Sequence, residues 1–157
     1  MALRKPLVLV DGILSQLPAG DTLDATITDE AVISMTNGSA ATTFLTGQPV
    51  YISGADLVNL GIANSLATSE IIGLCYQDIP PGISGNILAR GYLTLSDWTN
   101  IIGTAALVPG TVYYLDPDTA GMLTSTPPVK SKYYLVRIGR ALNTTTLEVV
   151  PRAPIAL

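Results

Sequence analysis

The chain has 157 residues, of which 48% are hydrophobic and only 13% are charged, about half the charged fraction of an ordinary soluble domain. It contains no histidine, which excludes Ser-His-Asp and Cys-His catalytic sites, and its net charge of −4 argues against a nucleic-acid partner. Its single cysteine, Cys75, excludes an internal disulfide and a zinc site built from several cysteines.

The first segment, residues 1–24, holds two short apolar runs on either side of an Asp-Gly turn, in the stretch KPLVLVDGILSQLP. This pattern predicts a β-hairpin. The hairpin either completes the protein's own barrel or is an arm that adds strands to a neighbouring subunit or to another protein. In the second case Leu7 and Leu9 fill pockets on the partner, while Arg4 and Lys5 meet acidic groups at the rim of the contact.

The same segment does not fit a secretory signal, because the apolar stretch Leu7–Val10 is shorter than the roughly 7–15 residues that a signal core needs. No run in the chain approaches the ~18 apolar residues of a membrane helix. We therefore expect a soluble protein without a membrane partner, made in a cytoplasm.

Alternation of apolar and polar residues dominates residues 25–157, which we predict to be one β-domain. In residues 25–36 one face is apolar and Val32 is an exception on the polar face; the apolar face holds Ala25, Ile27, Ala31, Ile33 and Met35. Residues 87–95 alternate in the same way. Further strands are expected where β-branched and aromatic residues cluster, at 48–53, 70–77, 111–116, 132–142 and 145–150.

Helical pattern is scarce. Residues 55–60 are predicted to form a short helix that ends at Gly61. Residues 96–102 are predicted to form one helical turn, with Ser96 as the N-cap and Trp98 packed beneath it. The fold class is therefore all-β.

A weak internal repeat links two parts of the chain. Residues 46–53 match residues 108–116, with Gly47 equivalent to Gly110, and residues 71–77 match residues 136–142, with Gly73 equivalent to Gly139. Two related β-units, near 46–91 and 108–151, predict a compact barrel or sandwich with pseudo-symmetry. Chance similarity between β-strands is the alternative.

The stretch YYLDPDTAGMLTS, residues 113–125, is the strongest candidate for chemistry. Asp116, Asp118 and Gly121 resemble the start of a calcium loop, but Ala120 stands where a third ligand belongs and Pro127 where the bidentate Glu belongs. As a catalytic pair, two aspartates on an exposed turn would both be ionised, and acid–base work needs their pKa values pushed apart. We therefore interpret the stretch as a hairpin turn, with Pro117 at its first corner and Gly121 at a positive φ.

Other candidate residues are weaker. Cys75 lies in an apolar strand and is expected to be a buried, inert thiol. Arg137 and Arg140, near Tyr133 and Tyr134, either form a patch for sugars or carboxylates or are solvated strand positions. The glycosylation motifs at 37–39 and 143–145 are expected to be polar turns. We expect no catalytic, metal or cofactor site, and no enzyme activity.

Five stretches cover most of the second part of the chain: GQPVYIS, LATSEIIGLC, GNILARGYLTLSDW, LVPGTVYYLDPDTAGMLTSTPP and YYLVRIGRALNTTTLEVVPRAPIAL. Together they resemble a β-domain of tailed-bacteriophage virion proteins. The N-terminal stretch resembles a lead-in found in many phage structural proteins, so the resemblance covers nearly the whole chain. Such domains occur as head decoration proteins and at the C-terminal ends of tail-fibre chains. The resemblance implies an all-β, trimeric virion component without catalysis.

Three functions follow as hypotheses. The first is a capsid decoration (cement) protein, a homotrimer on the virion surface that binds the major capsid protein from outside and stabilises the head. The second is a tail-tip or tail-fibre receptor-binding module. The third is a soluble β-domain with another use. The chain lacks the repetitive shaft of a complete fibre, which favours the first.

Overall fold

The computed structural model describes residues 7–10 and 13–16, at the level of the backbone, and residues 30–157. Thirteen strands and two four-residue helices make up the elements of these residues, which confirms the all-β prediction. β1 (Leu7–Val10) and β2 (Ile13–Gln16) pair antiparallel as a two-stranded sheet, with Val10 opposite Ile13. Arg4, Lys5 and the first part of the strand expected over 25–36 lie outside the described residues.

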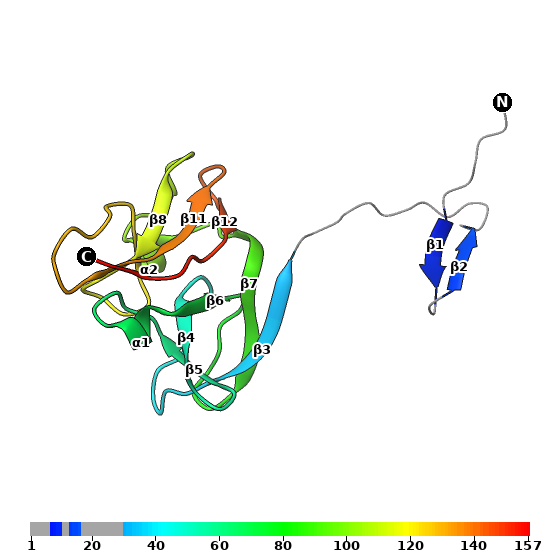
Figure 1. Cartoon of the computed structure of the whole chain (residues 1–157), viewed down its shortest axis with the longest axis horizontal. Coiled ribbons are helices and arrows are strands. Elements are labelled where there is room, and N and C mark those ends of the chain that lie inside the picture. Colours follow the sequence, from blue (N-terminus) through cyan, green and yellow to red (C-terminus); the bar gives the residue numbers. More distant parts are fainter. Residues whose placement is uncertain (1–6, 11–12, 17–29) are drawn as a thin grey trace.

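The first half of the domain is a closed five-stranded barrel (Figure 1). Its strands are β3 (Ala31–Asn37), β4 (Pro49–Gly54), β5 (Leu57–Leu60), β6 (Ile71–Cys75) and β7 (Ser84–Thr94). They follow the order β3-β5-β4-β6-β7, and β7 pairs with β3 again to close the ring. The short β3–β5 pairing is parallel and the other pairings are antiparallel.

The second half continues the same sheet from the far end of β7. Its strands are β8 (Val112–Leu115), β9 (Leu123–Thr124), β11 (Arg137–Ala141) and β12 (Thr146–Val149), in the order β7-β12-β11-β8-β9. β10 (Tyr134–Leu135) and β13 (Ile155–Ala156) form a separate pair that holds the C-terminal segment. The helices are α1 (Leu66–Ser69) and α2 (Thr99–Ile102).

The predicted internal repeat is visible in the strand order. Starting from β7 the first unit runs β7-β6-β4-β5, and starting from β12 the second runs β12-β11-β8-β9. The equivalent strands are β4 and β8, β5 and β9, β6 and β11, and β7 and β12, and they follow one another in the same order along the chain. In the first unit β3 pairs with residues 84–90 of β7, and in the second unit residues 91–94 of β7 pair with β12. β7 is therefore the final strand of the first unit and also takes the place of β3 in the second.

Backbone hydrogen bonds repeat with the strands. Gly47 N–H donates to Cys75 O at 2.8 Å, and Gly110 N–H donates to Ala141 O at the same distance. Cys75 N–H donates to Gln48 O, and Ala141 N–H donates to Thr111 O, both at 2.9 Å. Gly47 and Gly110 both have positive φ, 95° and 78°, a conformation that favours glycine.

Gly73 and Gly139 are equivalent for a different reason. Each faces the neighbouring strand so closely that a Cβ would overlap a carbonyl oxygen, that of Leu88 for Gly73 and that of Glu148 for Gly139. Neither has a positive φ, so close approach of two backbones explains both glycines.

Two hydrophobic cores share a wall made of β6 and β7. In the barrel core Cys75 and Ile87 pack with Phe44, Val50, Val58 and Ile79. Their chain neighbours Leu74 and Leu88 point the other way, into a larger core that contains Trp98 and most buried side chains of the second unit. Strands buried on both faces read as continuous apolar runs, which explains why alternation is lost at these positions.

The helix predicted over 55–60 is wrong, because residues 57–60 form strand β5 in register with β4. Asp56, at a φ of 56°, makes the tight turn between the two strands. The nearby helix is α1 instead, where the Ser65 hydroxyl accepts a hydrogen bond from Thr68 N–H.

The turn predicted over 96–102 contains α2, but Ser96 does not cap it. Asp97 Oδ1 accepts from Thr99 N–H at 2.8 Å instead. Trp98 is fully buried as expected and donates its Nε1–H to Thr145 O at 2.9 Å.

Candidate functional site

The Asp116–Gly121 stretch is the turn between β8 and β9. Asp116 Oδ1 accepts hydrogen bonds from the N–H groups of Asp118 at 2.8 Å and Thr119 at 2.7 Å. Gly121 has a φ of 77°, as the turn interpretation requires. The Asp116 carboxylate therefore caps the turn, because its side chain reaches back over the backbone that follows it.

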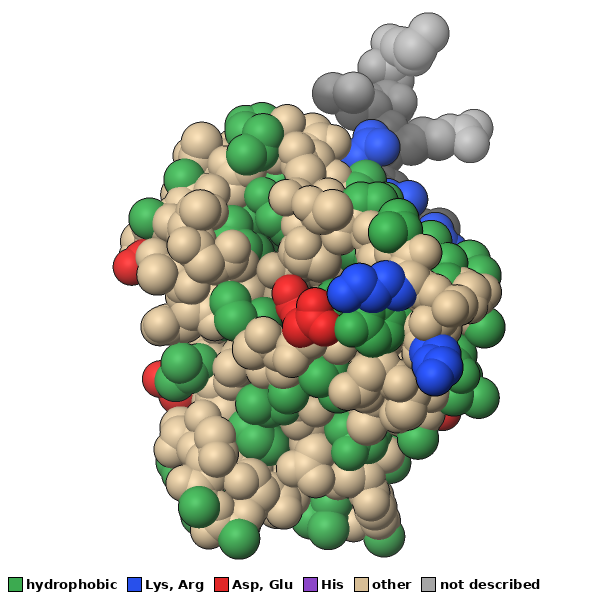
Figure 2. Space-filling model, turned by 90° about the vertical axis from the view of Figure 1, so that its left-hand side faces the viewer, with side chains coloured by type: hydrophobic (Ala, Val, Ile, Leu, Met, Phe, Trp, Pro, Cys, Tyr) green, Lys and Arg blue, Asp and Glu red, His purple; other side chains and the backbone are tan. Residues whose placement is uncertain are grey.

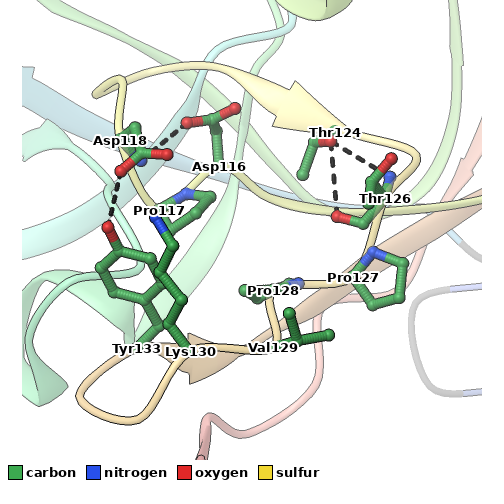
Figure 3. A pocket seen from close by; sticks show the side chains of 10 residues that line it. All are labelled: Asp116, Pro117, Asp118, Thr124, Thr126, Pro127, Pro128, Val129, Lys130 and Tyr133. Atoms are coloured by element: carbon green, nitrogen blue, oxygen red, sulfur yellow. Dashed lines mark hydrogen bonds between the residues drawn. The ribbon is translucent and has the colours of Figure 1, made fainter.

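Beside this turn lies an open cavity of about 240 Å³. The turn forms one wall, and the proline-rich loop that follows β9 forms the other (Figure 3). The residues that line it are Asp116, Pro117, Asp118, Thr124, Thr126, Pro127, Pro128, Val129, Lys130 and Tyr133. Only part of this set, the two aspartates and Tyr133, stands out in the sequence as candidate chemistry.

The polar groups of the cavity interact with one another. The Tyr133 hydroxyl donates to Asp118 Oδ1 at 2.7 Å, and Lys130 Nζ lies 5.6 Å from the centre of the Tyr133 ring. The hydrogen bond to Asp118 raises the pKa of Tyr133, because ionising the phenol would lose that bond next to a carboxylate. The arrangement offers an aromatic face, two carboxylates and one ammonium, which suits binding of a polar ligand.

Within residues 30–157 no three Asp, Glu, Cys or His side chains come close enough to hold a metal ion. Asp116 accepts hydrogen bonds from the backbone of the turn, and Asp118 accepts one from the Tyr133 hydroxyl. Asp116 therefore stabilises the turn, and Asp118 positions the tyrosine of the cavity.

Cys75 is fully buried in the barrel core. Burial raises the pKa of its thiol to about 12, and the nearby Asp78 carboxylate adds to the effect. The thiol is therefore neutral at physiological pH and is a packing residue.

The arginines and tyrosines of the predicted patch lie on different elements. Tyr133 belongs to the cavity, whereas Tyr134 lies in β10, where its N–H donates to Ala63 O at 2.9 Å. On β11, Arg137 is half-buried opposite Tyr114, and Arg140 is exposed opposite Glu148.

The two glycosylation motifs have different structures. Asn143 is exposed and caps a turn, accepting from the N–H groups of Thr145 and Thr146. Asn37 caps a turn at Ser39 but is also buried, and its Nδ2 donates to Thr42 O at 2.8 Å and Ile79 O at 2.7 Å. Asn37 therefore fastens the loop at the end of the barrel.

The surface carries many exposed apolar side chains and few charges (Figure 2). On β3, Val32 is 41% exposed and Ile33 is 40% exposed, although neighbours on a strand point to opposite faces. Sequence reasoning placed Ile33 on an inward face and so missed this surface. The signal was Val32, an apolar residue on the face expected to be polar.

The helices among the described residues are too short and too polar to span a membrane. No protein-family model matches this chain, and no curated protein matches it significantly. The cavity beside Tyr133 and the exposed surface of β3 are therefore the features that bear on function.

Proposed function

We propose that this protein is a virion structural protein of a tailed bacteriophage, a capsid decoration protein that binds the outside of the major capsid lattice as a homotrimer. It stabilises the head by bridging neighbouring capsid subunits. It is made in the host cytoplasm and resides on the capsid surface.

The observation that carries this proposal is the exposed apolar strand β3. Val32 and Ile33 are exposed on opposite faces of this one strand, whereas the side chains of the two cores are buried. Exposed apolar strands are usually covered by other chains, because they otherwise promote aggregation.

The low charge supports the same function. Only 13% of the residues are charged, and neutral threonine pairs occupy exposed strand positions, such as Thr94 with Thr146 at 2.9 Å. Surfaces depleted of charge are typical of interface cores. The resemblance to phage virion β-domains supports a virus particle as the assembly in which such interfaces are formed.

Cryo-electron microscopy of the intact particle tests the proposal. Density for this protein at three-fold or quasi-three-fold positions of the head lattice is the expected result. Density confined to the tail tip would reject decoration and support receptor binding.

The cavity beside Tyr133 is the one feature that favours the second candidate, a tail-tip receptor-binding module. An aromatic ring flanked by carboxylates is a common way to bind sugars, and here Tyr133 and Asp118 are held together by a hydrogen bond. Adsorption of particles to host cells separates the candidates. A Tyr133→Ala variant reduces adsorption if the protein binds a receptor, and leaves it unchanged if the protein is head cement.

A further inference from the structure

Strand β3 has one edge that is almost entirely unpaired. Along one side, residues 31–36 pair with β7 over the whole strand. Along the other side, only Thr36 and Asn37 pair, with Leu57 and Val58 of β5. Within residues 30–157, no strand pairs with this second side of residues 31–35 (Figure 1).

The direction of the backbone groups follows from two hydrogen bonds. Thr36 N–H donates to Asp56 O on the β5 side, at 2.8 Å, and Asn37 N–H donates to Ile83 O on the β7 side, at 2.9 Å. Successive residues of a strand direct their N–H and C=O groups to alternate sides, and β3 itself has no extra residue between 32 and 36. The N–H and C=O groups of Val32 and Ser34 therefore face the open edge, whereas those of Ile33 and Met35 face β7.

The open edge is also apolar. Ala31, Val32, Ile33 and Ser34 are all exposed and carry no charge. Proteins usually protect an edge strand with lysine, proline or a bulge on that strand, and residues 31–35 contain neither lysine nor proline. The edge has the properties of a strand that receives another strand.

We propose that this edge binds the N-terminal hairpin, residues 7–16, of a second copy of the chain. The inference concerns self-association within the proposed function. Its main test uses purified protein without capsids, so the inference can fail while capsid decoration stands.

The hairpin has a matching need for a partner. β1 and β2 pair with each other in a sheet of two strands, and such a hairpin is at best marginally stable alone in water. Each of its strands is four residues long and uncharged, so pairing with residues 31–35 buries no charged group.

Charges at the two ends of the edge complement the hairpin. The exposed carboxylates of Glu30 and Asp56 lie at the residue before β3 and at the turn that contacts Thr36. Arg4 and Lys5 directly precede β1 and its Pro6, so either strand direction brings this basic pair toward an acidic residue. Such rim contacts add association rate and salt sensitivity.

Chain length permits exchange between copies. The 14 residues from 17 to 30 can span up to about 46–50 Å, since an extended chain covers roughly 3.3–3.6 Å per residue. A body of this size has a radius of gyration of about 14 Å, so the hairpin can reach an adjacent copy. Val32 and Ile33 are also exposed, and a second copy can bring its body against them, which a hairpin from the same chain cannot do. Passing each hairpin to the next copy around a ring closes a trimer.

Hydrogen exchange measured by NMR tests the proposal with an internal control. The amides of Val32 and Ser34 face the open edge, and those of Ile33 and Met35 face β7. We expect Val32 and Ser34 to exchange at least about tenfold more slowly at concentrations where the oligomer forms than after dilution to monomer. Deleting residues 2–16 should abolish this protection while Ile33 and Met35 stay protected.

Sedimentation of edge variants gives a second readout. Ser34→Pro removes the outward N–H but leaves the ladder to β7 intact, a position where an edge strand accepts proline. Ser34→Thr keeps the N–H and is the matched control. We expect Ser34→Pro to sediment as a monomer and Ser34→Thr as a trimer. The fluorescence of Trp98 should show that both variants are folded.

Three results would overturn the proposal. Slow exchange at Val32 and Ser34 that persists in the diluted monomer places the hairpin on its own chain. Slow exchange that appears only on capsids places a capsid strand there. A trimer in which both amides exchange rapidly shows that the copies associate elsewhere, and the exchange measurement gives this answer even if Ser34→Pro fails to fold.

Discussion

The two β-units have the same strand order but end differently. In the first unit β3 reaches β5 and closes a barrel, whereas in the second unit the chain leaves β7 for α2, and β7 makes no pairing with β9. Residues 61–70 of the first unit contain α1, whereas residues 125–133 of the second form the proline-rich loop, which is one wall of the cavity. Ladder contacts and glycines maintain the shared framework, and the connections are free to differ.

The largest expected effect tests whether the two units are held by the same backbone contact. Gly73→Ala and Gly139→Ala each place a Cβ against a carbonyl oxygen of the adjoining strand. We expect each to lower the free energy of unfolding by about 3 kcal/mol or more. Urea unfolding followed by the fluorescence of Trp98, the only tryptophan, measures the change.

Gly82→Ala is the control for that pair. Gly82 has a φ of 70° but no atom within 4 Å of its added Cβ, so only the backbone conformation is penalised, by about 1–2 kcal/mol. If Gly73→Ala or Gly139→Ala costs no more than this control, the close approach is not what holds that unit together.

The first unit has a buried side-chain donor, the Asn37 amide, at the end of its barrel. Asn37→Ala removes hydrogen bonds to the carbonyls of Thr42 and Ile79, and Ile79 O then keeps only its bond from Phe44 N–H. We expect a loss of about 2 kcal/mol in unfolding free energy, since each of the two hydrogen bonds lost contributes about 0.5–1.5 kcal/mol. Trp98→Phe removes the matching donor to Thr145 O in the second unit and should cost about 1 kcal/mol more than packing alone explains. Circular dichroism serves for both variants, and equal stability of Asn37→Ala and the parent would contradict the role of Asn37.

Cys75 has Ala141 as its counterpart, which makes Cys75→Ala a substitution by the other unit's residue. We expect a loss of about 1 kcal/mol at pH 7 from the smaller side chain. The pKa of the thiol is 9.0 when exposed and about 12 when folded, so above pH 9 the unfolded chain loses this proton first. The parent should therefore lose unfolding free energy between about pH 9 and 12, by up to about 1.4 kcal/mol per pH unit from this group.

Cys75→Ala lacks that contribution. Its unfolding free energy should therefore approach that of the parent as the pH rises and exceed it at pH 10.5, by about 1 kcal/mol, as measured by urea unfolding at pH 8 and pH 10.5. A constant difference between the two proteins across this range would show that the thiol is not buried.

The smallest expected effect belongs to the cavity beside Tyr133, in the second unit. Asp118→Asn removes the carboxylate that accepts from Tyr133, so the pKa of Tyr133 should fall toward its ordinary value. An NMR titration of the Tyr133 ring measures this change, and stability should stay within about 0.5 kcal/mol because Asp118 is exposed. An unchanged pKa would mean that the two side chains do not pair in solution.

The strands and the repeat could be predicted from sequence because their causes are local. Alternation marks a half-buried strand, and Gly47 and Gly110 mark equivalent turns. Residues 55–60 were misassigned because Leu57, Val58 and Leu60 fit a short helix or a short strand equally well, and only the ladder with β4 decides.

The surfaces were harder to predict than the strands. An apolar pattern shows which side chains avoid water, but not whether the same chain or a partner covers them, so the exposure of Ile33 was missed. The cavity was missed because Lys130 and Tyr133 meet Asp118 only after the proline-rich loop folds back across the β8–β9 turn (Figure 3). The roles of Arg4, Lys5, Leu7 and Leu9 stay predictions.

The single strand β7 also determines how this protein can be divided. Its eleven residues belong to both units, so the boundary between them falls inside a paired strand and offers no exposed linker to a protease. Neither unit can be expressed alone without losing a wall of its core, and the described body should unfold as one cooperative block. A foreign peptide displayed on this scaffold therefore belongs in a surface turn, such as the open one at Gly82 or that at Gly103.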